Sequence, residues 1–153
     1  MSDIALKANQ DGSFDLDFDE KSKDLLLTDS LYNAVAISIG AYARNRNLKP
    51  NSAVLDPQLG GWWADALDPL GTLGGYLNEA YPGKLTDSTL AKVKDLVTEA
   101  LQWLIDDGVA KTVKCDVSTD ENDIVTVAVA IEKPDGVTDD YKYELNWKSA
   151  NGI

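Results

Sequence analysis

The segment from residue 62 to residue 68 combines aromatic and acidic side chains in a pattern that could bind and cleave a sugar chain. Trp62 and Trp63 offer ring faces for stacking, and Asp65 and Asp68 supply two nearby carboxyl groups. Two carboxyl groups suffice for glycoside hydrolysis. The alternative is structural, with the tryptophans filling a small core or a subunit contact and Asp65 capping a turn. We favour the structural interpretation, because 26 acidic residues will bring some pair together by chance.

Other catalytic groups are missing from the chain. It contains no histidine, which excludes Ser-His-Asp and Cys-His triads and removes the most frequent zinc ligand. Its single cysteine, Cys115, falls in an expected strand with no histidine to activate the thiol. The sequence 82–85 holds only the Gly-Lys part of a phosphate-binding loop. We therefore expect a protein that is not an enzyme and has no catalytic residues, no bound metal and no cofactor.

The alternating acids Asp15, Asp17 and Asp19 resemble the start of a calcium loop. Such a loop needs glycine at its sixth position and glutamate at its twelfth, where this chain has Glu20 and Leu26. The intervening apolar residues instead give the two-residue period of a strand with its acidic face in solvent. We therefore predict a plain strand and no calcium site.

Length and charge set further limits. The chain has 153 residues, which fits one domain spanning 1–153, and a net charge of −12. Nucleic acids and anionic membranes are poor partners for such a surface, because both are bound mainly through lysine and arginine. The first four residues show no basic and apolar signal sequence. The stretch Leu31–Ala43 is also shorter than the roughly 20 residues that span a bilayer.

Two helices are expected, separated by a long connection. The first covers about Leu31 to Arg44, is apolar on nearly all sides and has cap candidates at positions 28–30. The second follows the three-four spacing from Leu90 to Leu104, has cap candidates at positions 86–88 and ends at Gly108. Between them, residues 47–83 carry four prolines and six glycines, which predicts a long central loop.

The last third has the alternation of an antiparallel sheet. Strands are expected at 109–117, 124–133 and 141–148. Two short extended segments are expected before the first helix, at 4–6 and 14–18. The fold class is therefore α+β, with two main helices packed on a small antiparallel sheet, a C-terminal meander of three strands.

Two motifs carry a resemblance to a known family. The first is Gly60-Gly61-Trp62-Trp63-Ala64-Asp65, and the second closes the second helix as 100–110, Ala-Leu-Gln-Trp-Leu-Ile-Asp-Asp-Gly-Val-Ala. Together they resemble the Mu-type phage baseplate wedge family, related to the sheath initiators (gene 25-like proteins) of contractile tails. The resemblance spans about residues 3–148.

The resemblance implies a structural role in a contractile phage tail. A member of this family would be assembled in the host cytoplasm, sit in several copies in the virion baseplate, and bind wedge and tail sheath proteins. The sequence supplies a compatible mechanism, since an edge strand of a short meander can accept a strand from another subunit. We expect partner contacts at two groups of residues: Trp62, Trp63 and Asp65 in the loop, and Tyr141, Tyr143, Leu145 and Trp147 on one face of the last strand.

Two other functions stay open from the sequence. One is a carboxylate-dependent, lysozyme-like tail enzyme that degrades peptidoglycan through Asp65 and Asp68. The other is an acidic mimic of DNA, which the interspersed lysines and the extensive apolar core disfavour.

Overall fold

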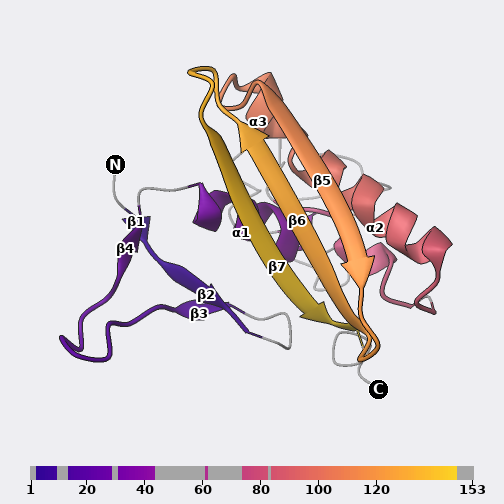
Figure 1. Cartoon of the computed structure of the whole chain (residues 1–153), viewed down its shortest axis with the longest axis horizontal. Coiled ribbons are helices and arrows are strands. Elements are labelled where there is room, and N and C mark those ends of the chain that lie inside the picture. The colour runs from indigo at the N-terminus through magenta and orange to yellow at the C-terminus, as the bar shows by residue number, and fades with distance from the viewer. Residues whose placement is uncertain are drawn as a thin grey trace.

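A three-stranded antiparallel sheet with helices on one face forms the body of the molecule (Figure 1). The computed structural model describes residues 3–9, 14–28, 31–43, 61, 74–82 and 84–147. The sheet consists of β5 (Thr112–Thr119), β6 (Ile124–Glu132) and β7 (Thr138–Asn146), in the order β5-β6-β7. The expected α+β class and C-terminal meander are confirmed.

The register of the sheet confirms the predicted faces. Cys115, Val129 and Tyr141 lie opposite one another across the three strands, and their side chains share the inner face. Val125, Val127, Val129 and Ile131 on the central strand are all fully buried. Short turns join the strands, and Gly136 supplies the left-handed conformation in the second, with φ +85°.

Three helices pack against the inner face of the sheet. They are α1 (Tyr32–Gly40), α2 (Asp87–Ala100) and α3 (Gln102–Asp106), and the short 3-10 helix η3 (Leu77–Glu79) precedes α2. Of the three cap candidates for α2, Thr86 takes the role and accepts a hydrogen bond from the Thr89 N–H at 3.3 Å, and Gly108 follows α3 with φ +70° as predicted. None of the helices in the described ranges is long and apolar enough to cross a membrane.

The helices differ from the prediction in three details. The second helix breaks at Leu101, whose ψ of 0° leaves the helical region and whose side chain is fully buried. The first helix ends at Gly40 and does not reach Arg44, because Ala41 is extended. The first helix begins only at Tyr32, after the residues predicted to cap it. Leu31 takes the cap position and makes no side-chain cap hydrogen bond, and its N–H donates to the Tyr141 hydroxyl at 3.0 Å.

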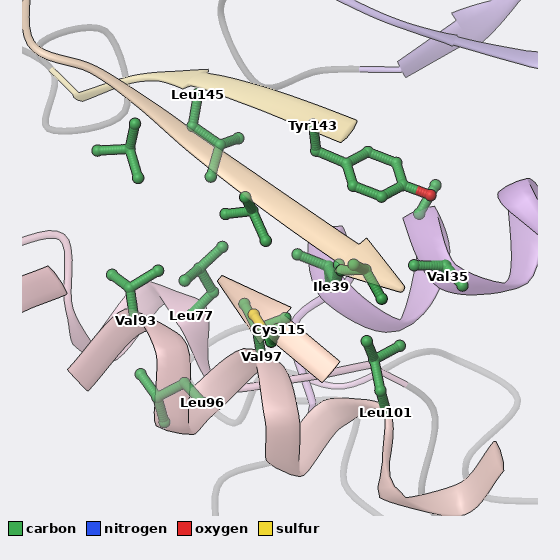
Figure 2. Packing of buried hydrophobic residues seen from close by; sticks show 14 of the residues in the cluster. Val35, Ile39, Leu77, Val93, Leu96, Val97, Leu101, Cys115, Tyr143 and Leu145 are labelled. Atoms are coloured by element: carbon green, nitrogen blue, oxygen red, sulfur yellow. The ribbon is translucent and has the colours of Figure 1, made fainter. Parts of the chain in front are cut away.

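The core lies between the sheet and the helices (Figure 2). Val93 of α2 points towards the strands, Leu96 and Val97 of the same helix are also buried, and Val35 and Ile39 of α1 close one end. Because α1 contributes buried residues around most of its circumference, it sits inside the structure, as its apolar composition predicted.

The N-terminal residues form a separate small arm beside β7 (Figure 1). Its four strands are β1 (Asp3–Ile4), β2 (Leu6–Ala8), β3 (Phe14–Leu16) and β4 (Leu27–Thr28). β1 pairs with β4, β2 pairs with β3, and Phe18 bridges to Leu25, so three short antiparallel pairs meet at one point. We call residues 3–9 and 14–28 the arm.

Three hydrogen bonds close the meeting point of the arm into a triangle. The Ala5 N–H donates to Leu26 O (2.8 Å), the Leu26 N–H to Asp17 O (3.0 Å), and the Asp17 N–H to Ala5 O (2.9 Å). Each strand therefore pairs with both of the others in turn. This arrangement satisfies the backbone at the junction without a larger sheet.

Candidate functional site

The residues that suggested chemistry do not form a reactive site within the described part of the chain. Cys115 lies on the inner face of β5, and burial raises its pKa to about 11, so the thiol is protonated at neutral pH. No cluster of three or more potential metal ligands occurs among the residues described. Trp62, Trp63, Asp65 and Asp68 lie outside the described residues.

The acids of the arm have structural partners. The Asp19 carboxylate accepts hydrogen bonds from the Lys21 N–H and the Ser22 hydroxyl, both at 2.9 Å, which lowers its pKa and closes the turn at the tip of the arm. Asp15 accepts from the N–H of Leu16 at 2.8 Å and lies in β3. The predicted strand is confirmed, but its predicted faces are not, because Leu16 and Phe18 are 43% and 52% exposed and Asp17 lies in the groove beside β7.

The four predicted partner residues of the last strand lie on the inner face of the sheet. Tyr143, Leu145 and Trp147 are only 3%, 8% and 4% exposed, and Tyr141 is half-buried. Tyr143 stacks on Tyr32, with ring centroids 5.2 Å apart, and its hydroxyl donates to Tyr32 O at 3.1 Å. These side chains therefore fix β7 to the chain's own core, and what β7 presents outward is its backbone edge.

The phase of the β6–β7 ladder shows which backbone groups point outward. At its two ends, the Lys133 N–H donates to Val137 O (2.8 Å) and the Trp147 N–H donates to Asp123 O (3.0 Å). Both pairs continue the register of the ladder, so odd-numbered residues of β7 bond to β6. The N–H and C=O groups of Asp140, Lys142 and Glu144 point to the other edge. No strand of the described ranges pairs along it.

A groove of about 510 Å³ lies beside that edge, between β7 and the arm. Lys142 and Glu144 line one side, and Ala5, Lys7 and Asp17 of the arm line the other. The charges on the two sides are mixed, two basic and two acidic. An extended segment in this groove would meet the β7 edge on one side and the arm on the other.

Asn33, in the first turn of α1, sets the position of the arm. Its buried side-chain amide donates to Ile4 O, and its oxygen accepts the Leu6 N–H at 3.1 Å. The amide thus pairs with the arm much as a neighbouring strand would. Because Tyr141 and Tyr143 bond to Leu31 and Tyr32 just before it, the start of α1 holds both walls of the groove.

Sequence reasoning missed Asn33, Lys142 and Glu144 as determinants of this site. A polar residue inside an apolar helix was the one available signal for Asn33. For Lys142 and Glu144, alternation with the aromatic residues placed them on the outer face. Which edge of β7 stays open depends on strand order, which the sequence does not state.

The fold and this edge define a small α+β protein with an open strand edge. The chain belongs to the phage protein GP46 family, whose model matches residues 31–138. It is also 32% identical over 147 residues to the Mu-like prophage FluMu protein gp46 of Haemophilus influenzae, covering 96% of this chain and 98% of that protein. No solved structure matches the chain. The predicted relationship to Mu-type phage proteins is confirmed.

Proposed function

We propose that this phage protein is a structural subunit of a contractile tail baseplate, where several copies bind wedge subunits and anchor the tail sheath by strand pairing. The observation that carries the proposal is the outer edge of β7, where the ladder directs the backbone of Asp140, Lys142 and Glu144 outward beside a groove. A strand from a sheath subunit would add to this edge and extend the sheet.

The charged side chains along the edge suit pairing with one specific partner strand. Lys142 and Glu144 form an ion pair at 2.6 Å on the outer face of β7. Charged residues on an edge strand discourage indiscriminate pairing between sheets. A partner strand must accommodate these charges to gain the backbone hydrogen bonds of the edge.

We also propose that the protein makes and breaks no bonds. The peptidoglycan-degrading alternative rests on Trp62, Trp63, Asp65 and Asp68, and no observation among the described residues favours it. Purified protein should therefore release no fragments from peptidoglycan. Release that disappears in Asp65→Asn protein would instead establish the enzymatic alternative.

The strand-pairing proposal predicts a specific effect of proline at Lys142. This residue's N–H points away from β6, so Lys142→Pro removes an outward donor while leaving the β6–β7 ladder intact. In a phage carrying this gene, we expect tails without attached sheath, counted by electron microscopy. Lys142→Ala keeps the N–H and should assemble normally.

Circular dichroism of the purified variants separates failed folding from failed pairing. Lys142→Pro protein should keep the wild-type spectrum and unfold within a few degrees of wild type. Normal sheath on particles that contain folded Lys142→Pro protein would refute strand pairing along β7.

A further inference from the structure

The arm carries an apolar surface that no described part of the chain covers. Large apolar residues flank each of the three junction residues, Ala5, Asp17 and Leu26, on both sides. We call these six residues the apolar ring: Ile4, Leu6, Leu16, Phe18, Leu25 and Leu27.

The register places the whole ring on one face of the arm. Its members lie opposite each other in pairs, Ile4 with Leu27, Leu6 with Leu16, and Phe18 with Leu25. Opposite residues of an antiparallel pair share a face, and so do alternate residues along one strand. The three junction residues between them therefore point to the other face.

Five of the six ring residues lie away from the body of the protein, and Leu6 lines the edge of the groove beside β7. Ala5 and Asp17, on the opposite face, line the same groove. In the ring, Leu27 is 67% exposed, Phe18 52%, Leu16 43% and Ile4 39%. A half-buried sheet ordinarily turns its apolar face to the core and its polar face to water. The arm does the reverse, which is typical of a surface that another molecule covers.

The charge of the arm identifies the kind of partner. Between residues 3 and 28 the chain has seven acidic residues and three lysines, a net charge of −4. Three of the acids, Asp19, Glu20 and Asp24, lie with Lys21 and Lys23 at the tip beyond the Phe18–Leu25 pair. A second copy would bring the same acidic arm and a further net charge of −12, so the two would repel. The partner must therefore be a different, basic polypeptide.

The geometry of the arm also selects the form of that partner. The backbone at the junction is already paired in the triangle of Ala5, Asp17 and Leu26. An incoming strand would find no backbone groups to pair with there, so the ring must be covered through side-chain packing. An amphipathic helix presents the apolar stripe that such a surface needs.

We propose that the apolar ring is the docking site for an amphipathic helix of a different polypeptide, with lysine or arginine flanking its apolar stripe. The site is separate from the β7 edge, so the protein would hold two partners at once, a helix on the arm and a strand at the sheet. This inference does not depend on strand pairing along β7.

The test uses a synthetic peptide of about 18 residues, roughly five helical turns, with a leucine stripe flanked by lysines. Titrated into ¹⁵N-labelled full-length protein, it should shift the backbone amides of the ring. A peptide with the same leucine stripe and glutamate flanks should bind at least about tenfold more weakly. Equal binding of both peptides would overturn the charge argument.

Two variants locate the binding surface. Phe18→Ser/Leu27→Ser removes the two most exposed ring side chains and should weaken binding of the lysine peptide by about tenfold or more. Val137→Ser removes an equally exposed apolar side chain, 51% exposed in the β6–β7 turn, and should bind as wild type. Amide spectra outside the arm should be unchanged in the double variant, and those outside the β6–β7 turn should be unchanged in Val137→Ser.

Other outcomes would overturn the proposal. Equal binding by the double variant and by wild type, or amide shifts confined to residues 138–146, would place the peptide elsewhere. Dimerisation of wild type that the double variant loses, measured by sedimentation, would make a second copy the occupant. Lys142→Pro protein should bind the peptide normally, so failure of strand pairing would leave this result intact.

Discussion

At the scale of single residues, a few polar side chains decide how the parts of this protein fit together. Trp103 donates from Nε1 to the Ser38 hydroxyl at 3.0 Å, and that hydroxyl donates to Ala34 O at 2.7 Å, which ties α3 to α1. Asn33 does the same between α1 and the arm. Buried polar groups are costly without partners, so each of these contacts selects one arrangement of the elements.

Replacing Asn33 should release the arm while the body stays folded. Asn33→Ala removes the acceptor of the Leu6 N–H and the donor to Ile4 O, at a cost of about 1–3 kcal/mol. We expect faster hydrogen exchange at the Leu6 amide in the variant. Exposed Asn78 provides the control, since Asn78→Ala should leave that rate unchanged. Unaltered exchange at Leu6 in Asn33→Ala protein would show that the arm is held by other contacts.

At the scale of elements, the end of α1 packs against a pair of glycines. Gly75 accepts from the Ala43 N–H at 2.9 Å and donates to Ala41 O at 2.8 Å, forming a short parallel bridge with the chain after α1. A Cβ on Gly74 would lie 2.5 Å from Ala41 O, and one on Gly75 would lie 2.9 Å from the Cβ of Ala100. Only glycine allows the backbones to approach this closely.

Two glycines with similar backbone conformations should respond differently to alanine. Gly74 (φ +93°) and Gly136 (φ +85°) both adopt left-handed conformations, but a Cβ on Gly136 would meet no other atom within 4 Å. Gly136→Ala should cost about 1–2 kcal/mol, from backbone strain alone. Gly74→Ala adds the clash with Ala41 O and should cost about 3 kcal/mol or more. Chemical denaturation measures both, and equal losses would mean that the backbone shifts to accept the methyl group.

At the scale of the whole molecule, acidic surface charge surrounds a core that contains ionisable groups in their neutral forms. Burial raises the pKa of Tyr81 to about 12 and that of Cys115 to about 11, and it also raises the pKa of Tyr143. The Tyr81 ring contacts Trp147 edge-on, with centroids 5.5 Å apart. The packing of β7 therefore depends on these groups staying protonated.

The protein should lose stability in alkaline solution. Below about pH 8 these groups are protonated in both states, so their contribution is complete. As the pH rises further, the unfolded chain loses their protons first, and the free energy of unfolding falls up to the folded pKa values. The fall should be of order 1–2 kcal/mol for each of Tyr81 and Cys115 between about pH 9 and 12.

Denaturation at several pH values checks this expectation. Tyr81→Phe keeps the ring contact with Trp147 but removes the hydroxyl, so its stability should fall less steeply above about pH 10. A pH dependence identical to that of wild type would exclude Tyr81 as a contributor.

The elements and their faces could be predicted from local sequence. Strict alternation in β6 and β7 required one buried and one exposed face, because successive side chains of a strand point in opposite directions. The three-four spacing of α2, a cap among residues 86–88 and an end near Gly108 followed from equally local rules. The motifs at 60–65 and 100–110 pointed to Mu-type phage proteins, which the family match bears out.

The surfaces left for partners became visible only in the folded chain. Alternation cannot tell whether Tyr143 and Trp147 pack on their own chain or on another, and here their own helices cover them. It also cannot reveal that the apolar residues of the arm face outward, because that depends on how Asn33 and the junction triangle orient the arm. Local sequence sets the direction of a side chain relative to its strand, whereas contacts between distant segments set what that side chain meets.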